Sequence, residues 1–405
     1  MYWADSITKR TREWISETLT RKRTGLPEAA RYAGGMLSLP YGKGSLHPPE
    51  VSGGRDEATG ARVLQLTSGE ANSHLSYFLQ SSFTPDGRKL IFTSYRTGEA
   101  QIFEAEFPGG ALRQLTDGAP VHAYSPTLSP DGEWLYFVRG GGVWRLHMKT
   151  LEETRVAEYE GAQLGECTLG DGGRWITAAY KRGAEQGLVA GRTDGADWRV
   201  IPFNRTVIHP QFHPLEPEWI EFAGDPAPRM HRVRRDGTGL ECLLENPFEE
   251  WITHETFLGA TGDLIFVHWR KALYRMDWTT RAVTAVTDYP VWHVSPSRSG
   301  AYILCDTNCP DEGVFEIDAR TGARRQVCWP GASNGGAQWR EPATAPWKTE
   351  AISALSWVEV PLDRVYGPQW THPHPCYSPD ERWVTFTSDR TGRAQVYVAE
   401  NTVTR

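Results

Sequence analysis

A short pattern of apolar and polar positions recurs along the chain. Each copy has an apolar residue, a turn of the Ser-Pro-Asp-Gly kind and then a run rich in β-branched and aromatic residues. Proline fixes φ at the second turn position, and aspartate and glycine suit the later positions. The clearest copies lie at residues 83–92, 128–137 and 377–386, and weaker ones at 169–177, 212–222, 258–267 and 294–305.

The spacing of these copies predicts the architecture. Most copies are about 40–45 residues apart, which is the length of a four-stranded propeller blade. The last interval is roughly double, and its excess falls in residues 328–366, a stretch rich in Pro, Trp and Gly that we interpret as a long loop over one face. Because the strands of one blade cannot bury both faces alone, the blades are expected to stack around an axis.

The two ends of the repeat array predict how the ring closes. The final β-run, residues 394–398, has no outer strand after it. An early segment, residues 61–67, resembles the outer strands expected at 112–116 and 283–287. We therefore predict an all-β seven-bladed β-propeller over residues 51–405, in which this N-terminal strand completes the last blade and removes the free edges. Residues 1–50 are predicted to be an N-terminal extension, partly helical or irregular.

Composition and charge narrow the class of protein. Forty glycines, 27 prolines and an aromatic share of 11% favour short strands joined by tight turns. The net charge of −7 gives no electrostatic reason to expect nucleic acid or an anionic membrane as a partner. No apolar run is long enough to span a membrane, and the basic N-terminus lacks the apolar core of a secretory signal. The six cysteines form no Cys-x-x-Cys pair, which predicts free thiols and a cytoplasmic location.

One segment near the C-terminus has the spacing of half a metal site. His372 and His374 alternate with Pro373 and Pro375, which favour an extended backbone before them. Residues two apart on an extended strand project from the same face, so two imidazoles are presented together, with the carboxamide of Gln369 three residues upstream. By itself the spacing is weak, and polar loop residues beside turn-forming prolines are the alternative.

Several motifs in the same order resemble one family. From about residue 58 to 398 the chain is similar to the oligogalacturonate lyases, cytoplasmic pectin-degrading enzymes with a seven-bladed propeller fold. The Gln-x-x-His-x-His element at residues 369–374 is the most specific of these motifs. The others are residues 74–80, His209-Pro210, Arg229-Met230, Thr253-His254-Glu255, His293 and Thr387-Ser388-Asp389.

The resemblance implies a metal site. In that family three histidines and a glutamine hold manganese, which corresponds here to His293, Gln369, His372 and His374. The chemistry agrees, because imidazole suits several first-row divalent metals and an amide oxygen shifts the preference toward harder ions such as Mn²⁺. Another divalent first-row metal ion in the same site is the alternative.

The resemblance also implies roles for further side chains. His254 is expected to be the general base, with Glu255 beside it orienting or tuning it. Arg229 is expected to clamp a substrate carboxylate or to stabilise the departing oxygen. His209, His74 and Tyr77 are expected substrate contacts, although His74 and Tyr77 are equally suited to supporting the first blade.

The implied function is β-elimination on an acidic oligosaccharide. A metal-dependent lyase would cleave short oligogalacturonides to 4,5-unsaturated uronates. One alternative keeps the mechanism and changes the 4-linked uronide, because the Trp-rich segment at 328–366 is distinctive and Trp faces often stack on sugar rings. A second alternative is a non-catalytic binding propeller. A serine hydrolase is disfavoured, because the propeller repeats leave no space in the chain for an α/β-hydrolase domain.

Overall fold

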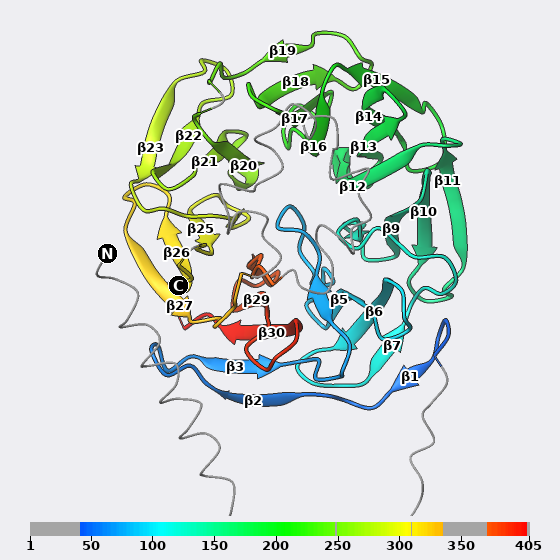
Figure 1. Cartoon of the computed structure of the whole chain (residues 1–405), viewed down its shortest axis with the longest axis vertical. Coiled ribbons are helices and arrows are strands. Elements are labelled where there is room, and N and C mark those ends of the chain that lie inside the picture. The colour runs from blue at the N-terminus through cyan, green and yellow to red at the C-terminus, as the bar shows by residue number, and fades with distance from the viewer. Residues whose placement is uncertain (1–40, 248, 309, 335–370, 403–405) are drawn as a thin grey trace, which may run out of the picture. The chain divides into compact units, whose positions relative to one another are not determined.

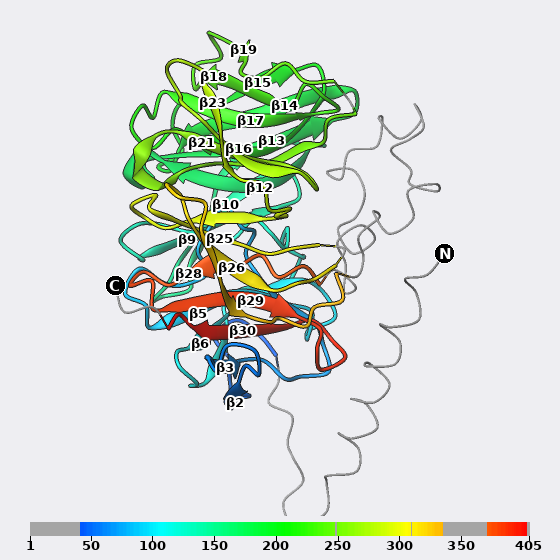
Figure 2. The same cartoon turned by 90° about the vertical axis from the view of Figure 1, so that its left-hand side faces the viewer.

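The computed structural model describes residues 41–402 except for 248, 309 and 335–370. Seven antiparallel sheets are arranged as a ring of blades around a common axis (Figure 1), and the side view shows the blades one above another (Figure 2). The all-β seven-bladed propeller predicted from the sequence is confirmed. Each repeat found in the sequence supplies the turn between the first two strands of one blade.

Blades 1 to 4 are formed in chain order, with the first strand of each blade innermost. Blade 1 has β4 (Ser73–Leu75), β5 (Lys89–Ser94), β6 (Gln101–Glu106) and β7 (Leu112–Gln114), with β1 (Leu46–His47) added outside. Blade 2 has β8 (Thr127–Leu128), β9 (Trp134–Arg139), β10 (Gly142–His147) and β11 (Glu153–Glu158). Blade 3 has β12 (Gln163–Gly170), β13 (Trp175–Arg182), β14 (Glu185–Arg192) and β15 (Arg199–Phe203), and a 3-10 turn η1 (Asp171–Gly173). Blade 4 has β16 (Thr206–Phe212), β17 (Trp219–Asp225), β18 (Met230–Arg234) and β19 (Glu241–Cys242).

Blades 5 to 7 complete the ring. Blade 5 has β20 (Ile252–Phe257), β21 (Leu264–His268), β22 (Ala272–Met276) and β23 (Val283–Thr287), and a 3-10 turn η2 (Gly259–Thr261). Blade 6 has β24 (Val294–Pro296), β25 (Tyr302–Cys305), β26 (Val314–Asp318) and β27 (Arg324–Cys328). Blade 7 has β28 (Cys376–Tyr377), β29 (Trp383–Ser388), β30 (Gln395–Glu400), β3 (Arg62–Gln65) and β2 (Ser52–Arg55).

The repeated turn has a local hydrogen-bond network that explains its sequence. In the clearest copies the hydroxyl of Thr84 or Ser378 donates to the aspartate two residues on, at 2.6 Å in both cases. The same hydroxyl accepts the backbone N–H five residues on, at 3.0 Å in both turns. Gly87 has φ of +69°, a conformation that glycine adopts without strain. The repeat therefore recurs because one turn geometry is needed in each blade.

The hydrophobic core is divided into seven clusters, and each fills the space between two consecutive blades. The closing strand β3 shows how alternation serves this arrangement. Val63 packs against blade 6, whereas Leu64, the next residue, packs with Phe92 of blade 1 and Val396 of blade 7. Successive side chains of a strand face opposite ways, so every strand in the ring contributes to two interfaces.

The closure predicted from the sequence is confirmed. Strand β3 pairs antiparallel with β30, with Leu64 opposite Val398. The structure adds two strands that the pattern did not reveal, β2 outside β3 and β1 outside β7. All four residues of β2 are exposed, and an exposed edge strand carries no alternation of polar and apolar positions that a sequence reading could detect.

Closure by β3 gives a prediction about stability. Leu64 is 4% exposed and lies between two blades, so Leu64→Ala should lower the free energy of unfolding by about 2–4 kcal/mol. Val283, in the equivalent outer strand of blade 5, is 40% exposed, and Val283→Ala should change it by less than about 0.5 kcal/mol. Urea titration of both variants tests this. Equal, small losses in the two variants would contradict a structural role for the closing strand.

Several sequence predictions fall on residues outside the described part of the chain. These are the loop at 335–366, Gln369, Cys309 and residues 1–40 of the N-terminal extension, whose partly helical or irregular character stays a prediction. The five described cysteines, Cys167, Cys242, Cys305, Cys328 and Cys376, are free thiols. None of the helices in the described part has the length and apolar character that a membrane crossing demands.

Candidate active site

β-Bulges in the innermost strands redirect side chains at the site. Strands β12, β16 and β20 each shift register by one bulge, between residues 164 and 167, 208 and 211, and 253 and 256. His209, His254 and His374 have φ of +58°, +52° and +45°, in a left-handed region that residues other than glycine rarely adopt. Such backbone strain persists only where surrounding contacts hold it, and it gathers at functional sites. Here the N–H of His209 donates to Glu166 at 2.6 Å, and that of His374 donates to Asp306 at 3.2 Å.

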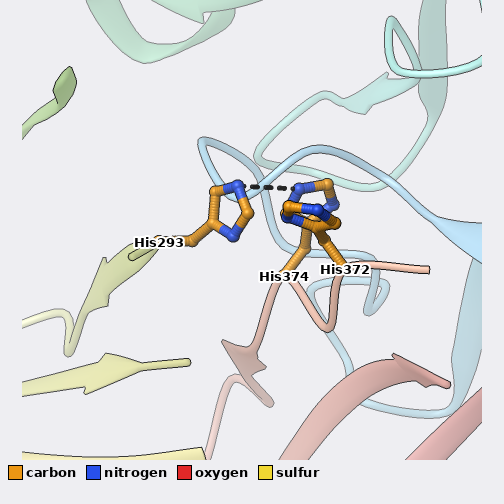
Figure 3. Close-up of side chains that lie close together, drawn as sticks. All are labelled: His293, His372 and His374. Atoms are coloured by element: carbon orange, nitrogen blue, oxygen red, sulfur yellow. Dashed lines mark hydrogen bonds between the residues drawn. The ribbon is translucent and has the colours of Figure 1, made fainter. Parts of the chain in front are cut away.

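Three buried histidines converge from two consecutive blades. One nitrogen from each of His293, His372 and His374 lies within 4.8 Å of the others. Figure 3 shows His293 entering from one side and the other two rings from the opposite side, with Nε2 of His293 3.1 Å from Nε2 of His374. His293 stands just before β24, and the other two precede β28. The structure thus brings together three of the four predicted metal ligands.

Neighbouring groups decide which nitrogens of these rings carry protons. Nδ1 of His293 donates its proton in a 2.8 Å hydrogen bond to Oδ2 of Asp306, so Nε2 keeps a lone pair toward the cluster. Burial raises the pKa of Asp306 to about 7, while backbone N–H groups of His293 and His374 oppose that rise. The indole N–H of Trp292 donates to Nδ1 of His372 at 3.0 Å.

These rings fit a first-row divalent ion. Two cis ligands at about 2.1 Å from an octahedral ion are roughly 3.0 Å apart, close to the distance between the nitrogens of His293 and His374. Burial lowers the pKa of His293 and of His374 well below the usual value. The neighbouring histidines lower both pKa values further. Neutral imidazoles are the form that binds metal. At His372 an ion would compete with the indole of Trp292 for one lone pair.

His254 lies beside this cluster, and its tautomer leaves Nε2 free to act as a base. Its ring centroid lies 4.3 Å from that of His293, and its Nδ1 lies 2.6 Å from the carbonyl oxygen of Trp292. Because a carbonyl only accepts, Nδ1 carries the proton and Nε2 carries the lone pair. Burial lowers the pKa of His254 well below its usual value, and the nearby His293 and His209 lower it further. The ring is therefore neutral near physiological pH and able to take a proton.

A second group of side chains faces the first from blade 4. Arg229, immediately before β18, donates from Nε to Glu255 at 3.2 Å and from Nη1 to Asp225 at 3.3 Å. Glu255 is also 3.2 Å from Nδ1 of His209, whose Nε2 is 3.1 Å from the hydroxyl of Tyr77. Tyr77 packs edge-on against His374, with ring centroids 5.0 Å apart, so it joins the two groups.

The remaining predicted substrate contact, His74, lies one layer further back. Its ring stacks on Tyr124 with centroids 4.7 Å apart, and Tyr124 in turn packs edge-on against His374 at 5.6 Å. Burial lowers the pKa of His74 to about 4, so this ring is neutral in the folded protein. Gln369, predicted as the fourth metal ligand, lies outside the described residues.

Sequence reasoning missed the acidic and indole groups that orient these histidines. Asp306, Glu166 and Trp292 hold the rings or backbone of His293, His209 and His372. Glu255, expected to orient its neighbour His254, instead turns its carboxylate toward Arg229 and His209. A usable signal was present, because Glu166, His209 and His254-Glu255 are ionisable residues at buried positions of inner strands. The β-bulges that orient these side chains have no comparable signature in the sequence.

Comparison with known proteins finds similarity to oligogalacturonate lyases. A family model described as oligogalacturonate lyase matches residues 43–181. An oligogalacturonate lyase from Dickeya dadantii is 24% identical, covering 85% of this chain and 95% of that protein. An oligogalacturonide lyase from Pectobacterium atrosepticum is 23% identical, covering 88% and 98%. A solved structure, an oligogalacturonate lyase in complex with manganese, has a TM-score of 0.76 at 22% identity and covers 89% of this chain and 98% of that one. The resemblance that the sequence motifs indicated is confirmed.

Proposed function

Starting from the resemblance to the oligogalacturonate lyases, we propose that this protein is a metal-dependent lyase that cleaves short oligogalacturonides by β-elimination. The observation that carries the proposal is the contact between His254 and His293, with ring centroids 4.3 Å apart. It sets a neutral imidazole with its lone pair on Nε2 directly beside a cluster of three histidines. Base and metal site are thus close enough to act on one sugar residue.

The proposed metal ligands are His293, His372, His374 and Gln369, and the proposed ion is Mn²⁺, with another divalent first-row metal as the alternative. Support comes from the mutual distances of the three histidines, from the lowered pKa values of His293 and His374, and from the similar structure that contains manganese. When bound, the ion would act as a Lewis acid on the uronate carboxylate and make the C5 proton more acidic. The carboxylate of Asp306 orients His293 from behind, as outer partners of metal-binding histidines do.

The chain's own side chains would carry out the proton transfer. Nε2 of His254 takes the proton from C5, the electron pair forms the C4=C5 double bond, and the C4–O4 bond breaks. Arg229 would donate to the substrate carboxylate or to the departing oxygen, where its fixed charge stabilises the negative charge that develops. His209 and Tyr77, which face the same space, would contact the hydroxyl groups of the sugar. His74 would act through Tyr124.

Metal analysis together with a uronide panel tests the proposal. The purified protein is expected to hold about one divalent ion per chain and to convert galacturonate oligomers to products that absorb at the ultraviolet band of a 4,5-unsaturated uronate. Chelation should remove the activity, and Mn²⁺ should restore it. The double variant His372→Ala/His374→Ala serves as the control without a metal site.

The panel also separates the alternatives. Absorbance with another 4-linked uronide, and none with galacturonate oligomers, would keep the mechanism and change the substrate. No absorbance with any uronide, from protein that has taken up the ion, would refute the lyase proposal. That result would favour a propeller that binds its ligand without cleaving it.

A further inference from the structure

The side chain of Glu255 points away from that of its sequence neighbour His254. It lies in the bulge of β20 and is completely buried. Its sequence neighbour His254 turns toward blade 6, where Nδ1 bonds the carbonyl of Trp292. The carboxylate of Glu255 turns the other way, toward blade 4. The bulge therefore sends two consecutive side chains to opposite sides of the same site.

Both oxygens of Glu255 are engaged, each by a different part of blade 4. Oε1 accepts from Nε of Arg229 at 3.2 Å, and Oε2 accepts from Nδ1 of His209 at 3.2 Å. The backbone is fixed as well, because Nε2 of Gln211 donates to the carbonyl of Glu255 at 2.9 Å, and Thr256 donates to Oε1 of the same Gln211 at 2.8 Å. One carboxylate thus ties Arg229 and His209 to a single point.

The charge balance keeps this carboxylate ionised. Burial alone would raise the pKa of Glu255, but the Arg229 guanidinium and the hydrogen-bonded His209 hold it below its usual value. The pKa of the neighbouring Glu221 shifts in the opposite direction, because burial and the charge of Glu255 raise it well above the usual value. The site therefore holds one charged carboxylate and one neutral acid, and only the charged one touches Arg229 and His209.

An ionised acceptor fixes what its two partners present to a ligand. A carboxylate can only accept, so His209 carries its proton on Nδ1, and its Nε2 then accepts the hydroxyl proton of Tyr77. Nε and Nη1 of Arg229 are taken by Glu255 and Asp225, whereas Nη2 is buried without a hydrogen-bond partner among the described residues. A buried, unsatisfied guanidinium nitrogen is costly unless an anionic oxygen of a ligand meets it.

We propose that Glu255 is the positioning residue of this site, orienting the free edge of Arg229 and the tautomer of His209 toward an acidic sugar. The inference rests on the proposed function, since it assigns Glu255 a part in that reaction. It differs from the role expected from sequence adjacency, because Glu255 acts on Arg229 and His209 and not on the ring of His254. The two hydrogen bonds of its carboxylate go to Arg229 and His209.

The kinetic test is Glu255→Gln, with Glu221→Gln as the matched control. Both changes replace a buried carboxyl group in the same region at constant size, but only the first removes a charged acceptor from Arg229 and His209. We expect Glu255→Gln to raise KM about tenfold and to lower kcat about 100-fold, the loss typical of misplaced catalytic groups. Glu255→Asp, which keeps the charge, should recover part of both. A folding defect would lower the active fraction, and hence kcat, without changing KM.

Nitrogen and proton NMR of the histidine rings provides a readout without substrate. Wild-type His209 is expected to carry its proton on Nδ1, with the downfield proton shift of a charge-assisted hydrogen bond. That signal should move upfield in Glu255→Gln and stay in Glu221→Gln. A proton on Nε2 in the wild-type protein would overturn the proposal even where Glu255→Gln fails to fold.

The failures of the inference and of the proposed function are distinguishable. Matching kinetics in Glu255→Gln and Glu221→Gln, in an active wild-type background, would overturn the role of Glu255 alone. A wild-type protein that gives no unsaturated product would refute the lyase proposal and with it the part assigned to Glu255 in the reaction.

Discussion

Replacing His254 by alanine is expected to lower kcat by about 10²–10⁴-fold while the metal content of the protein stays unchanged. The proposed reaction begins with removal of a weakly acidic C5 proton, and His254 is placed to take it. Its Nδ1 proton is committed to the carbonyl of Trp292, so the lone pair lies on Nε2. The ring of His254 thus combines a lowered pKa, a fixed tautomer and contact with His293. Rates with galacturonate oligomers and metal analysis of the same preparation would be measured together.

The control for this variant is another buried histidine outside the site. His213 is 2% exposed and donates from Nε2 to the carbonyl of Gly262 at 3.0 Å, so it links blade 4 to blade 5. His213→Ala should destabilise the fold and leave kcat per folded molecule within about twofold of wild type. Two results would contradict the assigned role of His254. One is an alanine variant that turns over at the wild-type rate, and the other is loss of the metal from that variant.

The blade count could be predicted from the sequence because a local rule repeats. The Ser/Thr-Pro-Asp-Gly turn needs a hydroxyl that accepts from the residue five positions on, and this requirement recurs at Thr84, Ser129 and Ser378. Even the degenerate copy in blade 6 keeps the interaction, since Ser297 accepts the N–H of Tyr302 at 3.0 Å. By contrast, β1 and β2 are short and lie on sheet edges, and the alternation that marks a half-buried strand is absent from them.

The arrangement of the site was less accessible to sequence reasoning. His372 and His374 were recognised from their spacing, but the contact of His374 with His293 depends on two blades meeting, 81 residues apart in the chain. Asp306 orients His293 across a hairpin, with no motif of its own. The β-bulges are the main reason why the site was harder to predict from the sequence than the blade count. One extra residue in an inner strand reverses the direction of a side chain, and a period of two cannot reveal where this happens.

Taken together, the bulges and the burial act on the same property of the histidines. Left-handed backbone at His209, His254 and His374 turns their rings into a region closed off by aromatic groups such as Tyr77 and Phe78. Burial there lowers the pKa of His254 and His374, so these two rings stay neutral where lone pairs are needed for a proton or a metal ion. The strain of these positions and the cost of burying polar rings would be offset when an ion and an acidic ligand bind.

His374→Ala is expected to remove a proposed metal ligand and so to cause a large loss of metal binding and of activity. The variant removes the nitrogen that lies 3.1 Å from that of His293, and we expect metal affinity to fall by more than about 100-fold, with activity lost in parallel. Asp306→Asn, which weakens only the orienting partner of His293, should fall between this variant and wild type, by about 10–100-fold. Thermal unfolding with and without Mn²⁺ measures the affinity without substrate, because an ion at 100 times its Kd stabilises the folded state by about 2.7 kcal/mol. An unchanged Mn²⁺-dependent shift in His374→Ala would remove His374 from the metal site, and activity at the wild-type level would remove the metal from the reaction.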